Sequence, residues 1–301
     1  MRRTGFLKQG SHSVGVQRQY TASAGKIANC QIGVSLSVAS RNEHVPIDFA
    51  LYRPKSWLDS PKRREEARIL AETSFKTKPE LALDLVVRAL EDELPGEIVL
   101  ADAGYGTSVD FRNGLVAYGL DYAVGINGAS KVWTVDAHGR RSRDSVSALD
   151  LGLRVGRKAF RHVNWRDRTR GPLFSKFCFR RVVVAHDDGT PAADRDPVWL
   201  FIEWPEGESK PTKFTLTTLP RRMSKKRIVC TIKERWRTER AYEELKGELG
   251  LDHYEGRSFP GWNHHVSVVL CCYAFVVGER LRRFPPSAAR GSPARSVERA
   301  A

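Results

Sequence analysis

The sequence predicts an α/β fold, in which a mixed sheet is flanked by helices and carries an inserted β-rich region. Three observations lead to this prediction. Apolar residues alternate with polar ones in residues 30–38, which is the period of a half-buried strand. Helical and strand patterns then alternate through residues 79–126. Helical periodicity disappears from Lys131 to Leu219 and returns afterwards.

The first two strands form an antiparallel hairpin in this interpretation. Ile32, Val34, Leu36 and Val38 occupy every second position of the first strand, and residues 45–52 supply the second. The polar residues 40–43 make the turn between them. We expect residues 54–64, which are polar and contain proline, to be a surface connection.

A strand–helix–strand unit follows a first amphipathic helix. That helix is predicted over residues 79–94, with Pro79 near its start and Pro95-Gly96 after its end. Residues 98–101 form a continuous apolar run, typical of a strand covered on both faces, and the run stops at Asp102. Glycines at 104 and 106 indicate a tight turn. A helix over 109–118 and a strand over 122–126 complete a right-handed βαβ unit.

The rest of the chain is predicted to return from strands to helices. Strands are expected at residues 182–185, 199–202 and 214–217, and helices at 227–249 and 264–281. We therefore divide the chain into a first core segment (4–130), a β-rich basic insertion (131–219), a second core segment (220–283) and a disordered basic tail (284–301).

Composition restricts where the protein acts. The longest apolar run, residues 266–277, is too short to span a membrane, and no secretory signal follows the basic start. Five cysteines form no CxxC pair, and an odd count argues against a disulfide framework. We therefore expect a protein of the bacterial cytoplasm, associated with the nucleoid, with no membrane partner.

The charge distribution points to a polyanion as partner. Net charge is +15, and residues 131–181 hold fourteen basic residues against four acidic ones. A basic proteome is the alternative explanation of net charge alone. Trp133 and Trp165 lie within the basic run, where they either stack on bases or are simply buried. The DNA-contacting residues that we predict are Lys8, Arg18, Arg140, Arg141, Arg157, Lys158, Arg161, Arg221 and Arg222, although solvated strand positions are the simpler explanation of Lys8 and Arg18.

Two carboxylates stand out as candidates for chemistry. Asp102 follows a buried strand, where α/β sheets place functional groups, although an Asp there also caps the next turn. On the helix predicted over 227–249, Arg235, Glu239, Tyr242 and Lys246 are spaced to share one face. Such a set suits metal-assisted phosphoryl chemistry, whereas charge pairs on a solvated helix are the simpler explanation.

The order of these elements, and several motifs, resemble one family. The stretches L-A-D-A-G-Y-G (100–106), E-L-G-L-D-H-Y-E-G-R-S (248–258), and H-S-V-G-V-Q-R-Q-Y with G-K-I-A-N-C-Q (12–20 and 25–31) resemble the DDE transposases of bacterial insertion sequences. The resemblance runs from about Thr4 to Arg283 and implies a ribonuclease H-like core.

The resemblance also implies roles for residues. Asp102 matches the second catalytic carboxylate and Glu239 the third, so both would ligate Mg²⁺ or Mn²⁺, while Arg235 and Lys246 would steady the scissile strand beside Tyr242. The tyrosine position of the family signature holds Ile232 instead. The implied reaction is metal-dependent cleavage of double-stranded DNA at element ends and transfer of the freed 3′-hydroxyl to target DNA. A homodimer is one arrangement that the resemblance allows.

One departure from the family concerns the first catalytic Asp. The family places it directly before a motif like Thr4-Gly5-Phe6, whereas this chain has Arg2 and Arg3 there, and no apolar strand precedes them. Since that Asp bridges the two metal ions, we expect inefficient cleavage. We expect a truncated or wrongly started reading frame, which translation of the upstream DNA would settle. The alternatives are a DNA-binding remnant that does not cut and an RNA-binding module.

Overall fold

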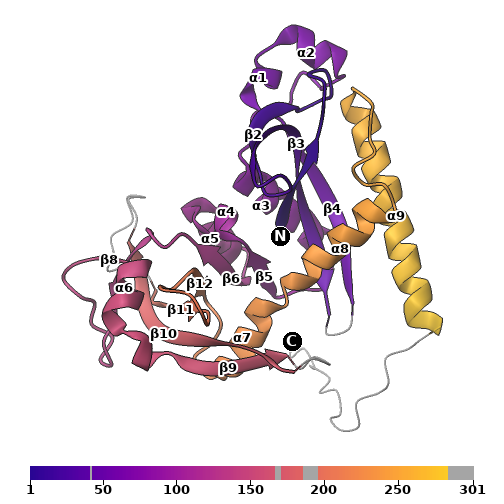
Figure 1. The fold of residues 1–301 in the computed structure, drawn as a ribbon. Helices are drawn as coiled ribbons and strands as arrows, with labels where there is room; N and C mark the ends of the chain where they lie inside the picture. Colours follow the sequence, from indigo (N-terminus) through magenta and orange to yellow (C-terminus); the bar gives the residue numbers. More distant parts are fainter. Residues whose placement is uncertain (41–42, 167–170, 186–195, 284–301) are drawn as a thin grey trace, which may run out of the picture.

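A computed structural model describes residues 1–301 except 41–42, 167–170, 186–195 and 284–301. It confirms an α/β fold with a mixed sheet flanked by helices. Figure 1 shows the first sheet in the upper half, the later strands at lower left, and α7 and α8 running between the two parts. No helix in the described part of the chain combines the length and apolar character needed to cross a membrane.

The first sheet is built around one long strand. Its members are β1 (Arg2–Leu7), β2 (Gln17–Thr21), β3 (Lys26–Ala39) and β4 (His44–Tyr52). Strand β3 pairs antiparallel with each of the others: β1 lies on one side, and β2 and β4 share the other. The predicted hairpin is therefore confirmed as β3–β4. Strand β1 covers only part of β3, because its register ends with Arg2 opposite Ser35.

The second sheet joins the βαβ unit to the basic region. Strand β5 pairs parallel with β6, which confirms the βαβ prediction, and β6 pairs antiparallel with β12. The order is β5-β6-β12-β11-β10-β7-β8, with β9 on β10. These strands are β5 (Ile98–Ala101), β6 (Asp121–Ile126), β7 (Lys131–Thr134), β8 (Val146–Ser147), β9 (Arg161–Arg166), β10 (Leu173–Ala185), β11 (Val198–Trp204) and β12 (Lys213–Thr217).

Helices cover both sheets. They are α1 (Lys55–Leu58), α2 (Pro61–Glu66), α3 (Lys78–Glu91), α4 (Ala103–Gly106), α5 (Val109–Ala117), α6 (Ala148–Val155), a 3₁₀ turn (Arg157–Ala159), α7 (Lys225–Lys233), α8 (Trp236–Gly247) and α9 (Phe259–Arg283). Helix α3 begins where predicted because Thr77 and Glu80 form a reciprocal capping box and Pro79 occupies the first turn. Its buried face carries Leu81, Leu85 and Val86.

Three details differ from the sequence predictions. The expected surface connection at residues 54–64 forms α1 and α2, because Trp57 and Leu58 are buried. Helix α6 lies within the region where helical periodicity was not detected, and it is only eight residues long. The predicted helix over 227–249 is interrupted after Lys233, where Arg237 and Thr238 bond to carbonyls three residues back and tighten the turn.

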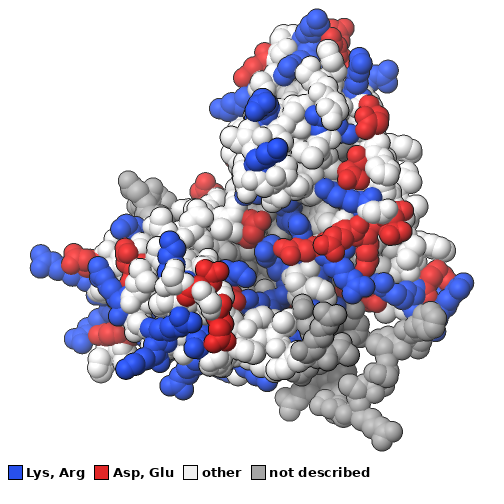
Figure 2. Space-filling view, in the orientation of Figure 1, with Lys and Arg blue, Asp and Glu red and all other residues white. Residues whose placement is uncertain are grey.

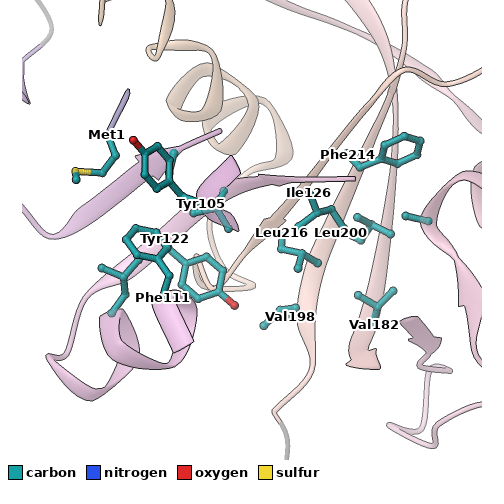
Figure 3. Packing of buried hydrophobic residues seen from close by; sticks show 14 of the residues in the cluster. Met1, Tyr105, Phe111, Tyr122, Ile126, Val182, Val198, Leu200, Phe214 and Leu216 are labelled. Atoms are coloured by element: carbon teal, nitrogen blue, oxygen red, sulfur yellow. The ribbon is translucent and has the colours of Figure 1, made fainter. Parts of the chain in front are cut away.

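Three apolar clusters stabilise this arrangement. One lies between the second sheet and helices α3 and α5, and Figure 3 shows Met1 at its end, beside Tyr105. A second joins β4 to α8 and α9 through Phe49, Tyr242 and Trp262. The third packs α7 on β9–β11. Strand β5 is less covered than predicted: Ala101 is buried, whereas residues 98–100 are half-buried. The proposed domain division stays a prediction, and its tail, 284–301, lies outside the described residues.

A buried ion pair ties α7 to β11. Lys233 Nζ lies 2.7 Å from both carboxylate oxygens of Glu203, and the two side chains are 16% and 8% exposed. Lys233 also lies over the Trp165 ring, 4.4 Å from its centroid. Burial lowers the pKa of Lys233, and the charge of Glu203 opposes that shift.

Replacing Lys233 alone should therefore destabilise the fold. We expect Lys233→Met to lower the free energy of unfolding by about 3–5 kcal/mol, because Glu203 is left charged and unpaired in a dry site. The double variant Lys233→Met/Glu203→Leu should recover most of that loss, since it removes both charges. Urea denaturation of both variants measures this, and a double variant no more stable than the single one would contradict it.

Candidate active site

Asp102 lies at the carboxyl end of β5 and caps α4. Its Oδ1 accepts a 2.8 Å hydrogen bond from the Gly104 N–H. Helix α4 lies directly on β6, since a Cβ on Gly106 would come within 2.0 Å of the Gly125 carbonyl oxygen. The capping alternative raised by the sequence is thus observed, and the βα turn holds the carboxylate at the sheet edge. The cap engages one oxygen, so it does not exclude a second role.

Glu239 lies on the first turn of α8 with its side chain 52% exposed. Its Oε1 is 3.7 Å from an Arg235 guanidinium nitrogen and 3.9 Å from Arg2 Nη1. The charge pairing with Arg235 that the sequence offered as the simpler explanation is therefore present. Arg2, from the opposite end of the chain, is a second cationic neighbour, and sequence spacing within the helix gives no sign of it.

Asp102 and Glu239 lie on either side of strand β1. A Cβ on Gly104 would lie 2.9 Å from both Arg3 Cζ and Asp102 Oδ1, so the Arg3 guanidinium adjoins the Asp102 carboxylate. Burial is the main cause that lowers the pKa of the Met1 amino group to about 5. The nearby charge of Arg235 lowers this pKa further, and the charge of Asp102 opposes the shift. The two carboxylates therefore flank the first three residues of the chain, from α4 on one side and α8 on the other.

Tyr242 and Lys246 anchor α8 to the first sheet. Tyr242 is buried, donates a hydrogen bond to Ser35 Oγ, and has Arg2 Cζ 5.1 Å from its ring centroid. Lys246 Nζ donates a 3.0 Å hydrogen bond to the Gly5 carbonyl oxygen, and burial lowers its pKa. The predicted shared helical face is thus split: Glu239 faces solvent, whereas Tyr242 and Lys246 turn toward β1 and β3.

Two buried groups next to this site, Tyr105 and His44, are not among the site residues that the sequence predicted. The Tyr105 hydroxyl is buried and has no hydrogen-bond partner among the residues that the structure describes, and burial, followed by the charge of Asp102, raises its pKa. His44 Nε2 lies 3.1 Å from Thr238 Oγ1, and burial, then the Met1 amino group, lowers the His44 pKa to about 4. Tyr105 stands inside the A-D-A-G-Y-G motif, which could have drawn attention to it; His44 carries no such signal.

The site has two carboxylates and an excess of arginine. Within the described ranges, no group of three or more His, Cys, Asp or Glu side chains is arranged to hold a metal ion. Arg2 and Arg235 lie 3.9 and 3.7 Å from Glu239 Oε1, and the Arg3 guanidinium lies near Asp102 at Gly104. As they stand, these residues do not fit a pair of divalent cations, because a cation already neighbours each carboxylate.

The predicted DNA-contacting residues fall into two groups. Those in the basic region and the loop after β12 are exposed: Arg140, Arg141, Arg157, Lys158, Arg161, Arg221 and Arg222, and Arg18 on β2 is also exposed. In Figure 2, lysine and arginine side chains gather over the lower-left lobe formed by these later strands. Lys8 differs, because its side chain is 5% exposed and its ammonium donates to the Tyr254 carbonyl oxygen.

Comparisons with known proteins identify the family of the chain. The family described as "DDE superfamily endonuclease" matches residues 3–172, more than half of the chain. That segment includes Asp102 and ends before Glu239. A probable transposase for insertion sequence element IS701 from Microchaete diplosiphon is 31% identical over 124 residues, which cover 41% of this chain and 30% of the relative. The chain therefore belongs to the DDE superfamily of endonucleases, a family of enzymes.

Proposed function

We propose that this protein is a transposase of the insertion-sequence type that binds double-stranded DNA but, as the chain stands, cleaves it inefficiently. The observation that carries this proposal is the contact of Arg2 and Arg3 with the environments of Glu239 and Asp102. Family membership supports the transposase part, as does the likeness to the transposase described above. The action in the bacterial cytoplasm, the recombination of element ends with target DNA and the homodimer belong to this proposal as well.

The arginines change what the site can hold. In this family, divalent metal ions supply Lewis-acid stabilisation of the phosphodiester, and we propose that Asp102 and Glu239 would hold Mg²⁺ or Mn²⁺ only where carboxylates replace Arg2 and Arg3. Here the formal charge of Arg2, Arg3, Arg235, Asp102 and Glu239 together is +1. A site with this charge favours a phosphate over a metal cation, because guanidinium groups donate paired hydrogen bonds to phosphate oxygens.

The proposed DNA surface combines cations with tryptophan rings. Arg141 Cζ lies 4.4 Å from the centroid of Trp133, and Lys225 Nζ lies 3.1 Å from that of Trp199. Arg181 also lies over Trp199, and burial, together with the charge of Arg221, lowers the pKa of both Arg181 and Lys225. Clustered positive charges repel one another, and a bound phosphate relieves that repulsion. Phosphate binding is therefore favourable at such a cluster.

Metal binding is expected to appear only when the arginines are replaced. Arg2→Asp/Arg3→Asp changes the formal charge of the five site residues from +1 to −3 and places new carboxylates beside Asp102 and Glu239. We therefore expect this variant to bind Mn²⁺ in a spectroscopic titration of the free ion, whereas the unmodified chain should not.

The matched control is Arg221→Asp/Arg222→Asp, an adjacent pair on the loop between β12 and α7. This control changes the net charge of the chain by the same amount as Arg2→Asp/Arg3→Asp. Equal Mn²⁺ binding by the two double variants would therefore contradict the proposal.

Cleavage by the chain as it stands should be at background level. We expect no nicking of supercoiled DNA above buffer with Mg²⁺ or Mn²⁺, and no change for Glu239→Gln, because the cationic site opposes metal entry. Gel analysis of plasmid forms measures this. Nicking that Glu239→Gln abolishes would show a working site and would reject the inefficient-cleavage part of the proposal.

DNA affinity is expected to depend on salt. The logarithm of the association constant should fall linearly with the logarithm of salt concentration, with a slope of about −0.9 for each phosphate neutralised. Arg157→Ala/Lys158→Ala/Arg161→Ala should make the slope shallower by about 2–3 if all three contact phosphates. Fluorescence anisotropy of a labelled duplex gives these values.

A lysine far from the basic lobe serves as the control. Lys62 lies on α2 with its side chain 84% exposed, so Lys62→Ala should leave the slope unchanged. A salt-independent affinity, or an equal loss for Lys62→Ala, would contradict the proposed surface. A preference for RNA over duplex DNA at matched salt would favour an RNA-binding module instead.

A further inference from the structure

Helix α9 is apolar on all its sides over about three turns. Residues 267–278 contain no charged side chain. One face of the helix is buried in the apolar cluster shared with β4 and α8, through Trp262, Val266, Val269, Tyr273 and Val277. A surface helix normally carries polar residues on its other face, and a helix that is apolar all round is normally buried all round. The outer face of α9 is therefore an apolar surface that the described part of the chain leaves uncovered.

This outer face is exposed over its whole length. Phe275 is 69% exposed, and Val268 and Val276 are also exposed. Cys271 and Cys272 lie on the same side and are exposed as well. Figure 1 shows α9 along the outer edge of the molecule, with β4 and α8 on its inner side. A contiguous apolar face marks a contact with another molecule, and a face without charge does not suit DNA as that molecule.

The outer face has the residue spacing of a two-helix contact. Intervals of four and three residues alternate along it, which is the spacing that keeps one line of side chains against a partner helix. At 1.5 Å per residue, this line is about 27 Å long. We name it the α9 seam, and its residues are His264, Val268, Cys271, Phe275, Gly278 and Arg282.

Large and small side chains alternate along the α9 seam. In an antiparallel pair of identical helices centred on position 273, residues equally far from that position face each other. Phe275 then faces the partner's Cys271, and Val268 faces the partner's Gly278, so each large side chain meets a small one. A parallel pair would place Phe275 against Phe275 and glycine against glycine. The seam is therefore complementary to itself in the antiparallel orientation, as a two-fold contact requires.

Gly278 suits a position of close approach between helices. A Cβ added there would meet no atom within 4 Å, so no contact in the described part of one copy requires glycine. Glycine weakens the interior of a helix relative to alanine. A second helix accounts for glycine at this position, because the missing side chain leaves room for the partner's Val268.

The charges at the two ends of α9 favour the same orientation. Arg282 and Arg283 are exposed at its C-terminal end. Asp252 and Glu255 lie in the segment before α9, which contacts the first turns of the helix at His265. Antiparallel pairing brings the arginines of each copy toward the acidic end of the other, whereas parallel pairing brings arginine to arginine. Charge and side-chain size therefore select one arrangement.

We propose that the α9 seam is the contact between two copies of this chain, packed as an antiparallel helix pair. The inference rests on the homodimer included in the proposed function and assigns its interface. A single pair of helices is a small interface compared with the ~800 Å² per partner of a standard one, so we expect a weak, concentration-dependent dimer.

An exchange of side-chain sizes tests this interface in the full chain. Gly278→Val places two valines opposite each other and should weaken the dimer by about tenfold or more, because the close approach is lost. Adding Val268→Ala again places a large residue opposite a small one, so Gly278→Val/Val268→Ala should recover most of the affinity. Sedimentation equilibrium, from low micromolar to a few hundred micromolar protein, measures the dimerisation constant.

A control of equal composition is Gly278→Val/Val116→Ala, because Val116 is exposed on α5, away from α9. It should dimerise as weakly as Gly278→Val. Equal affinity of the two double variants, or a dimer unaffected by Gly278→Val, would overturn the seam while leaving the homodimer in place. A monomer at every concentration would overturn both, and the salt dependence of DNA affinity tests the DNA-binding part of the proposed function separately. Thermal unfolding checks that each variant is folded.

Discussion

The insertion of β1 between the two sheets is the constraint on which the site depends. Strand β1 pairs with β3 in the first sheet, and Met1 bonds to β5 in the second. From the same strand, Arg2 reaches Glu239 on α8 and Arg3 adjoins Asp102 on α4. The strand that separates Asp102 from Glu239 therefore also places a positive charge beside each of them.

Charge magnitudes decide what these contacts do. Two opposite charges about 4 Å apart gain about 4 kcal/mol at an effective dielectric constant near 20, but an exposed pair retains little of that gain. Because Glu239 is half exposed, its pairing with Arg2 and Arg235 contributes little to folding. The same arginines place positive charge near both carboxylates, which opposes the approach of a divalent cation.

How far the sequence predicted this structure depends on the range of the interactions concerned. Local patterns identified the β3–β4 hairpin, α3 and the β5–β6 unit, because the spacing of apolar residues and the helix-capping residues lie within each segment. They missed the interruption before Arg235. They also missed the burial of Tyr242, which depends on contacts with β3 and β1. They also missed the pairing of β12 with β6, since a link between segments so far apart leaves no local pattern.

The candidate site was predictable in part for the same reason. Asp102 followed from a buried strand that ends in a carboxylate, whereas Glu239 needed a family resemblance, because an isolated helical Glu beside Arg is an ordinary surface pattern. The resemblance also identified Arg2 and Arg3 as a departure. It could not show that each arginine adjoins a different carboxylate, since that depends on the alternation of β1 between α4 and α8.

The alternation of β1 separates the two arginines. Arg2 points toward α8 and Arg3 lies beside Asp102, because side-chain direction alternates along a strand. Strand β1 is held on β3 by backbone hydrogen bonds, which every residue except proline can form. The two arginine side chains therefore bear on the charge beside the carboxylates rather than on the pairing that positions β1.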